Sequence, residues 1–118
     1  MNQDPNCIFC RIVAGQAPSD IVYESEDVIA FRDLHPVAPT HVLLVPKCHV
    51  TSLHELAGRD ERSTLAAALL VAARAVAESE GLGNGYRLIS NVGADGGQTV
   101  GHTHVHLIGG KPLSPRLL

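Results

Sequence analysis

Short runs of apolar residues recur along the chain, and turn residues separate them. Runs of this length that are rich in Val, Ile and Tyr predict β-strands. Only Ser25-Glu26-Asp27 separates the first two runs, which predicts a hairpin. The third run is almost continuously apolar and predicts a strand that is buried on both faces. Together the runs predict five strands, over residues 21–24, 28–32, 41–45, 86–90 and 102–108.

A different period marks the middle of the chain, where apolar residues follow one another at helical spacing. This pattern predicts one long helix from residue 59 or 60 to residue 80. Asp60 and Glu61 lie in its first turn, where acidic groups suit the helix dipole, and Gly81 and Gly83 end it. The stripe that faces the core consists of Leu65, Leu69, Ala72, Ala73 and Val76.

Two shorter segments complete the pattern. A short helix is predicted over residues 7–14, and one helical turn around residues 52–56. The order of three strands, a long helix and two strands predicts an α+β domain with a five-stranded antiparallel sheet. The 118 residues fit a single domain, with tails over residues 1–6 and 111–118.

Charge and composition narrow the classes of partner. The formal net charge of −3 gives no general attraction to nucleic acid or to anionic membranes. Aromatic residues make up only 3% of the chain, too few for a platform that stacks bases. No apolar run approaches the length that spans a bilayer, and the polar N-terminus lacks the pattern of a secretory signal. We therefore expect a cytoplasmic protein that binds neither nucleic acid nor membranes.

Three of the seven histidines alternate near the C-terminal end of the chain. In a strand, alternate side chains share one face, so His102, His104 and His106 would lie in a row. Imidazoles make a poor core, because each ring has two nitrogens that need partners. A metal site and a chance arrangement are alternatives, but the pattern favours chemistry by histidine, either as nucleophile or as acid and base.

A glycine-rich segment, residues 91–101, leads directly into the histidines. Gly96-Gly97-Gln98-Thr99 offers backbone N–H groups, an amide and a hydroxyl, which are donors that suit phosphate oxygens. An ordinary hairpin connection is the alternative. If the loop holds a phosphate, the middle histidine, His104, is placed to attack the phosphorus and to form a covalent intermediate.

Cys7 and Cys10 form a Cys-x-x-Cys pair, which in a cytosolic chain is typical of metal or redox chemistry. Zinc would need two further ligands. Two buried thiols on a short helix are the alternative to a metal site. The candidates for the other ligands are Cys48, His41, His49, His54 and one of the alternating histidines.

Residues 102–108 match the pattern of the histidine triad (HIT) family, His-φ-His-φ-His-φ-φ, in which φ is apolar. Thr103 is the one departure. The resemblance extends over nearly all of residues 7–110, and within the family this sequence is similar to the HINT-like branch. The further segments that carry it are Cys7-Ile8-Phe9-Cys10-Arg11-Ile12, Ala38-Pro39-Thr40-His41-Val42-Leu43, Val45-Pro46-Lys47 and Asp95-Gly96-Gly97-Gln98-Thr99-Val100.

The resemblance implies a HIT-like fold, a five-stranded antiparallel sheet with one long and one short helix. It also implies a homodimer in which two sheets join edge to edge. The implied activity is hydrolysis or transfer of nucleotides at the α-phosphorus, with His104 as the nucleophile that forms a nucleotidyl-histidine intermediate. His106 would contact the phosphate and His41 would support proton transfer. Catalysis in the family needs no metal.

The resemblance also implies binding residues. Asn91, Gly97, Gln98 and Thr99 would hold the α-phosphate and the bridging atoms, and Asp33 would bind the ribose hydroxyls. The base pocket would be formed by Ile8, Phe9, Ile12, Phe31, Leu34 and Leu43. Some bacterial members carry a structural zinc, and the matching positions are Cys7, Cys10, His49 and His102. As a zinc ligand, His102 would not act as a general acid.

Three features bear on the branch. The third histidine, His106, speaks against the galactose-1-phosphate uridylyltransferase branch, which has glutamine there. Residues 107–110 resemble HINT-like proteins, which hydrolyse purine nucleoside phosphoramidates. Thr99 instead matches the Gln-Thr-Val of dinucleoside polyphosphate hydrolases. We expect a phosphoramidate hydrolase that releases AMP or GMP. The alternatives are a dinucleoside polyphosphate hydrolase, or a nucleotide-binding or scaffold protein with incidental hydrolysis.

Overall fold

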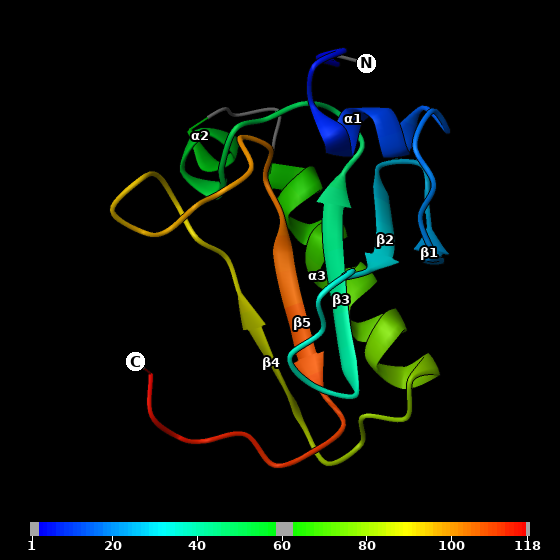
Figure 1. Cartoon of the computed structure of the whole chain (residues 1–118), viewed down its shortest axis with the longest axis vertical. Coiled ribbons are helices and arrows are strands. Elements are labelled where there is room, and N and C mark those ends of the chain that lie inside the picture. Colours follow the sequence, from blue (N-terminus) through cyan, green and yellow to red (C-terminus); the bar gives the residue numbers. More distant parts are fainter. Residues whose placement is uncertain (1–2, 59–62, 118) are drawn as a thin grey trace.

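A single antiparallel sheet of five strands forms the centre of the molecule (Figure 1). The structure, a computed structural model, describes residues 3–58 and 63–117. Along the sheet the strand order is β1-β2-β3-β5-β4, so the last strand of the chain lies between two earlier ones. The strands are β1 (Ile21–Glu24), β2 (Val28–Arg32), β3 (Thr40–Pro46), β4 (Tyr86–Ile89) and β5 (Val105–Gly109).

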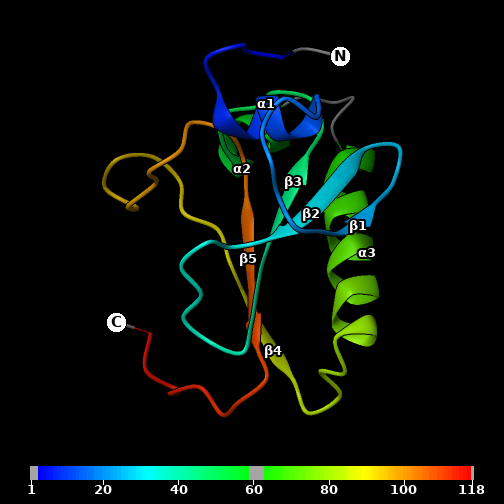
Figure 2. The same cartoon turned by 45° about the vertical axis from the view of Figure 1, so that its right-hand side comes forward.

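One long helix, α3 (Ser63–Ser79), runs along one face of the sheet (Figure 2). Two short helices, α1 (Ile8–Val13) and α2 (Leu53–Ala57), lie near the end of the sheet where β3 finishes (Figure 1). The one short helix that the family resemblance implies is therefore accompanied by a second one. Among the described residues, no helix is long and apolar enough to cross a membrane.

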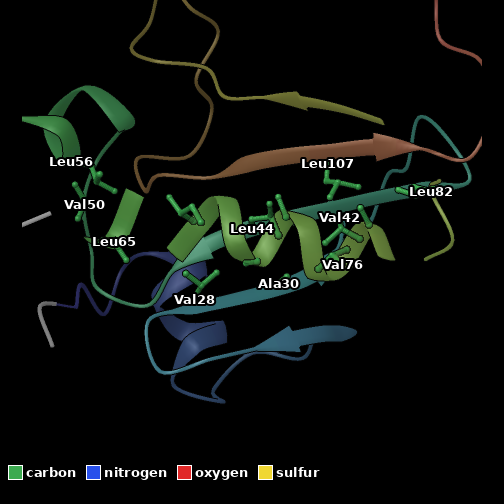
Figure 3. Packing of buried hydrophobic residues seen from close by; sticks show 14 residues of the cluster. Val28, Ala30, Val42, Leu44, Val50, Leu56, Leu65, Val76, Leu82 and Leu107 are labelled. Atoms are coloured by element: carbon green, nitrogen blue, oxygen red, sulfur yellow. The ribbon is translucent and has the colours of Figure 1, made fainter. Parts of the chain in front are cut away.

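Alternation along β2 and β3 sends their side chains into two separate cores. Val28 and Ala30 of β2 and Leu44 of β3 pack against α3 (Figure 3). The neighbouring residues on the other face, such as Phe31 and Leu43, pack against α1. Both faces are covered, which explains why β3 is apolar almost throughout, as its sequence predicts.

The C-terminal end of α3 agrees with the sequence pattern to within one residue. The helix ends at Ser79 rather than residue 80. Gly81 follows with φ +73°, a conformation that favours glycine, and its N–H donates to the Glu78 carbonyl. The N–H of Leu82 donates to the Ala77 carbonyl, which completes a Schellman motif. The predicted start at residue 59 or 60, with Asp60 and Glu61, lies outside the described residues.

The predicted strand over residues 102–108 is too long at its start, since β5 begins only at Val105. The preceding segment, residues 102–104, makes its hydrogen bonds to residues outside the neighbouring strands. The backbone N–H of Thr103 donates to the Val50 carbonyl (2.7 Å), in the connection between β3 and α2. The hydroxyl of Ser90 donates to the His104 carbonyl (2.8 Å). Two of the three alternating histidines therefore lie on a segment before β5 that is held by hydrogen bonds to Val50 and Ser90, and only His106 lies in the sheet.

Candidate active site and metal centre

Of the three alternating histidines, His104 and His106 lie side by side and form a row with His41, although only His106 of the three belongs to a strand. The ring centroids of His104 and His106 are 5.2 Å apart, and His41 on β3 lies 5.2 Å beyond His106. Phe9 of α1 packs edge-on against both His102 (5.9 Å) and His104 (5.2 Å). The register explains the position of His106, because β5 pairs it with Leu43, two residues along β3 from His41.

A backbone carbonyl determines which nitrogen of His104 carries hydrogen. Its Nδ1 lies 2.8 Å from the His102 carbonyl oxygen, which can only accept. In the neutral ring Nδ1–H therefore donates, and Nε2 keeps an unprotonated lone pair. The side chain is 5% exposed and lines a cavity. A buried imidazole with a defined tautomer and an available lone pair is suited to nucleophilic attack.

The tautomer of His106 is determined in the same way, through His41. The N–H of Val37 donates to Nδ1 of His41 (3.2 Å), so the hydrogen of the neutral His41 ring is on Nε2. That nitrogen lies 2.9 Å from Nδ1 of His106, which must accept. His106 then presents Nε2–H as a donor. Burial lowers the pKa of His106, and the neighbouring His104 and His41 lower it further.

Asp33 lies beside this pair, just beyond β2. Its Oδ2 is 3.5 Å from Nε2 of His41, and its Oδ1 accepts the backbone N–H of His35 (2.8 Å). Asp33, His41 and His106 present ligand atoms within 4.8 Å of one another. The carboxylate is a weaker influence on His106 than burial, and it acts in the opposite direction by raising the pKa.

A cavity of about 320 Å³ opens in front of His104 and His106. This volume lies within the range of small-molecule sites. All of the expected base and ribose residues line it, together with one residue of the expected phosphate loop. From the predicted set the lining includes Ile8, Phe9, Ile12, Phe31, Asp33, Leu34, Leu43, Thr99, His104 and His106. The cavity is therefore apolar on the α1 side and carries imidazoles and a carboxylate at its inner end.

Five lining residues were not predicted. Arg32 and His35 flank the predicted Asp33, and Val100 follows Thr99, so proximity in sequence was a usable signal for these three. Pro18 and Ser19 lie in the connection between α1 and β1, and nothing in their sequence indicates a binding role.

Three residues of the predicted phosphate loop, Asn91, Gly97 and Gln98, do not line this cavity. The amide nitrogen of Gln98 donates to the carbonyls of Thr51 (2.6 Å) and Val100 (2.9 Å). Its amide oxygen accepts the N–H of Gly93 (2.9 Å). In this structure Gln98 therefore joins the glycine-rich loop to the connection between β3 and α2, and Thr99 is the member of the loop that reaches the cavity.

Phe9 also contacts a second cluster through His102. This cluster consists of Cys7, Cys10, His49 and His102, whose ligand atoms lie within 4.8 Å of one another. Nδ1 of His102 is 3.4 Å from Sγ of Cys7 and 3.5 Å from Sγ of Cys10. Nδ1 of His49 is 3.3 Å from Sγ of Cys10 and 3.2 Å from Nδ1 of His102. Cys48, His41 and His54, the other candidate ligands, do not belong to this group.

These separations fit a tetrahedral zinc ion. With Zn–S of about 2.3 Å and Zn–N of about 2.0–2.1 Å, tetrahedral geometry places sulfur and nitrogen about 3.6 Å apart and two nitrogens about 3.3–3.4 Å apart. The tautomer of His102 also fits, because its Nε2 lies 2.9 Å from the Pro46 carbonyl and must donate to it. The lone pair of Nδ1 then points toward the thiols. Such an outer hydrogen bond is typical of metal-ligating histidines.

The pKa values of His102 and Cys10 in the cluster are also compatible with a metal site. Burial lowers the pKa of His102 to about 4, so this ring is neutral near pH 7, as a ligand must be. Burial raises the pKa of Cys10 in the absence of a metal, although the Asp4 N–H opposes it by donating to Sγ (3.3 Å). A bound cation would reverse that effect and hold the thiolate. The four residues therefore form a Cys2His2 cluster that suits a metal ion.

Comparison with known proteins agrees with this geometry. A family model described as the HIT domain matches residues 14–113. The chain belongs to the HIT family, as the sequence resemblance predicts. It is a hydrolase of this family, and its similarity is to the phosphoramidase and zinc-binding members. The two cysteines of the metal cluster precede the matched range.

Individual relatives are similar over almost their whole length. The purine nucleoside phosphoramidase of Escherichia coli K12 is 45% identical over 111 residues, which cover 93% of this chain and 92% of that protein. The 14 kDa zinc-binding protein of Zea mays is 46% identical over 112 residues, with 94% and 87% covered. The solved HIT family hydrolase of Clostridium thermocellum superposes with a TM-score of 0.93 at 43% identity, covering 98% and 100%. These structures confirm the predicted α+β fold.

Proposed function

We propose that this protein hydrolyses purine nucleoside 5′-phosphoramidates and releases AMP or GMP and an amine. The observation that carries the proposal is the state of His104, a residue that lines the cavity: its Nδ1–H is engaged by the His102 carbonyl, so the lone pair of its neutral ring is on Nε2. The similarity to the phosphoramidase of Escherichia coli supports the substrate class. The apolar part of the cavity, lined by Phe9, Phe31 and Leu43, would receive the base.

In the first step Nε2 of His104 attacks the phosphorus, and the P–N bond breaks with its electron pair on nitrogen. The amine leaves after it takes up a proton, and the nucleotide stays on His104. In the second step water attacks the same phosphorus, loses a proton and displaces His104, so that one water molecule is consumed overall. Splitting one displacement into two in this way is the advantage of a covalent intermediate.

His106 and His41 would stabilise the charge that develops on phosphorus. The tautomer that His41 imposes leaves Nε2–H of His106 as a hydrogen-bond donor for a phosphate oxygen. The pKa of His106 is lowered, which favours the neutral ring, and it is the neutral ring in which Nδ1 accepts from His41 and Nε2–H is the donor. Asp33 would bind the ribose hydroxyls at the same end of the cavity, and Thr99 would contact the phosphate or its substituent.

We also propose that Cys7, Cys10, His49 and His102 hold a structural zinc ion. Their spacing and the tautomer of His102 support this, as does the similarity to a zinc-binding protein of Zea mays. When bound, zinc would supply a cross-link between α1, the segment after β3 and the segment before β5. None of the four residues lines the cavity, so they would act on the framework rather than on the substrate.

A homodimer is the third part of the proposal. β4 is an edge strand of the sheet, and Tyr86 and Leu88 are exposed on it. Leu70 and Val71 of α3 are also exposed. An exposed edge with apolar side chains is suited to pairing with a second copy. Sedimentation of the wild type and of a Leu88→Lys variant tests this, and a monomeric wild type at micromolar concentration would contradict it.

The test of function is steady-state hydrolysis of adenosine 5′-phosphoramidate beside a diadenosine polyphosphate, with the His104→Ala variant. We expect faster phosphoramidate turnover by the wild type, no turnover by His104→Ala, and retained AMP binding because the cavity persists. His54→Ala, which changes an exposed histidine outside the site, is the matched control and keeps full activity. Turnover by His104→Ala would refute its role.

One observation favours a second substrate class. Thr99 lines the cavity, and its sequence context matches dinucleoside polyphosphate hydrolases. Preference for the diadenosine compound in the same assay would assign the protein to that class. Absence of turnover on both substrates would instead favour a nucleotide-binding protein.

A further inference from the structure

Thr103 occupies a position that the histidine triad pattern reserves for an apolar residue. Its side chain is 1% exposed, and its hydroxyl donates to the Val50 carbonyl at 2.8 Å. Its own backbone N–H donates to the same oxygen at 2.7 Å. One carbonyl therefore receives two hydrogen bonds from one residue. An apolar side chain at this position would leave only the backbone bond.

This pair of hydrogen bonds matters for the site because of where Thr103 lies. Thr103 lies between His102 of the metal cluster and His104 of the cavity. Residues 102–104 precede β5, so the hydrogen-bond ladder of the sheet does not hold them. The His104 ring depends on this segment directly, because its Nδ1–H donates to the His102 carbonyl. A shift of that carbonyl would change both the direction and the tautomer of the His104 ring.

The two residues joined by this pair of hydrogen bonds are also sequence neighbours of two members of the Cys2His2 cluster. Val50 follows His49, and Thr103 follows His102. A metal ion held by His49 and His102 would join the same two segments that the Thr103 hydroxyl joins. The two restraints therefore act on one separation, and each reduces the dependence of that separation on the other.

We infer that Thr103 is a positioning residue, whose hydroxyl holds residues 102–104 against Val50 so that His104 keeps its reactive tautomer when the metal cluster is empty. This inference rests on the proposed function of His104 and deepens it. Thr103 does not line the cavity, and it acts on the reaction only through the segment that carries His104.

The decisive variant is Thr103→Val, which keeps the shape of the side chain and removes the hydroxyl. Since the Thr103 N–H still satisfies the Val50 carbonyl, the change leaves no buried acceptor unpaired. With zinc bound we expect kcat to fall about twofold at most. After treatment with a chelator we expect kcat of the variant to fall about tenfold below that of the chelated wild type, with KM unchanged. Thr103→Ser, which keeps the hydroxyl, restores kcat.

A second measurement does not depend on turnover. Imidazole ¹⁵N NMR of the chelated proteins at neutral pH reports whether Nδ1 or Nε2 of His104 carries hydrogen. We expect one tautomer, Nδ1–H, in the wild type and in Thr103→Ser, and a mixture of tautomers in Thr103→Val. Thermal unfolding of all three proteins checks that each is folded.

Several outcomes would overturn the inference. Equal kcat for chelated wild type and Thr103→Val, with one tautomer in both, would show that the hydroxyl positions nothing. A rise in KM at constant kcat would place its effect on binding, and a Thr103→Val protein that does not fold would make the role purely structural. If the wild type turns over no phosphoramidate, the proposed function fails, but the tautomer measurement still decides the role of Thr103.

Discussion

The N-terminal helix α1 gives the sharpest test of how the framework supports the site, through Phe9. This ring is 6% exposed and packs edge-on against Phe31 (5.6 Å between centroids), His102 and His104. Replacing a buried Phe by Ala costs about 3–5 kcal/mol. A domain of this length has a free energy of unfolding of roughly 6–18 kcal/mol, so the Phe9→Ala variant should fold.

The loss should act locally as well as globally. α1 has six residues and cannot persist without its packing. Its detachment would remove one wall of the cavity and move Cys7 and Cys10 away from the histidines. We therefore expect Phe9→Ala to weaken AMP binding at least tenfold. Phe9→Leu, which keeps most of the volume, should cost about 1 kcal/mol of stability and weaken binding only slightly.

Leu69→Ala is the matched control. Leu69 lies on α3, is equally buried, and belongs to the core on the opposite face of the sheet. Its truncation should cost about 2–5 kcal/mol, similar to Phe9→Ala, and leave AMP binding unchanged. Urea unfolding measures the stabilities, and isothermal titration measures the binding. If both variants weaken AMP binding equally, or if Phe9→Ala weakens neither property, the assignment of Phe9 to the cavity wall is wrong.

Three further predictions concern the framework. Chelation should lower the melting temperature and make the Cys7 and Cys10 thiols reactive; reactivity that is the same before and after chelation would contradict a metal there. In the metal-free protein, burial lowers the pKa of His102 from 6.5 to about 4, so the unfolded chain binds a proton that the folded chain excludes. The contribution of His102 to the free energy of unfolding is therefore fully present above about pH 6.5 and is lost as pH falls toward 4, by about 3 kcal/mol at most. Urea unfolding of His102→Asn should lack this dependence of the free energy of unfolding on pH. Glu80→Gln should cost about 1 kcal/mol in urea unfolding, because Glu80 receives two hydrogen bonds from Arg32 (2.7 and 3.0 Å), which is partly exposed; no change would mean that solvent screens the pair.

The short apolar runs predicted β1 and β2 with their observed bounds. β2 is buried almost throughout, whereas β1 is only partly buried, and its signal came from its β-branched and aromatic residues. The position of the histidine row followed from alternation, and the cysteine pair from its spacing. The start of β5 was predicted wrongly for a physical reason. Residues 102–104 do not pair with a neighbouring strand: the Thr103 N–H donates to the Val50 carbonyl, and the His104 carbonyl accepts from the Ser90 hydroxyl. Partners so distant in the chain leave no pattern in the local sequence.

The same limit applies to the site. Gln98 has the side chain of a phosphate ligand, yet its amide is engaged by Gly93, Thr51 and Val100. Which carbonyl an amide meets depends on the packing of segments far apart in the chain. The tautomers of the histidines are determined by main-chain groups too, and any residue at those positions would supply the same carbonyl or N–H. Residue types therefore indicated which groups could take part in chemistry, while contacts with the backbone determine which atom of each group donates or accepts a hydrogen bond.

The strand order has a consequence for synthesis of the chain. β5 is made last among the strands but lies between β3 and β4, and it carries His106 and the register of the site. Until it leaves the ribosome, β4 has no partner and one edge of the buried strand β3 stays open. A product that stops before residue 105 therefore lacks the middle of its sheet rather than an end. Synthesis of β5, and not of the preceding strands alone, is therefore required before the sheet can be complete.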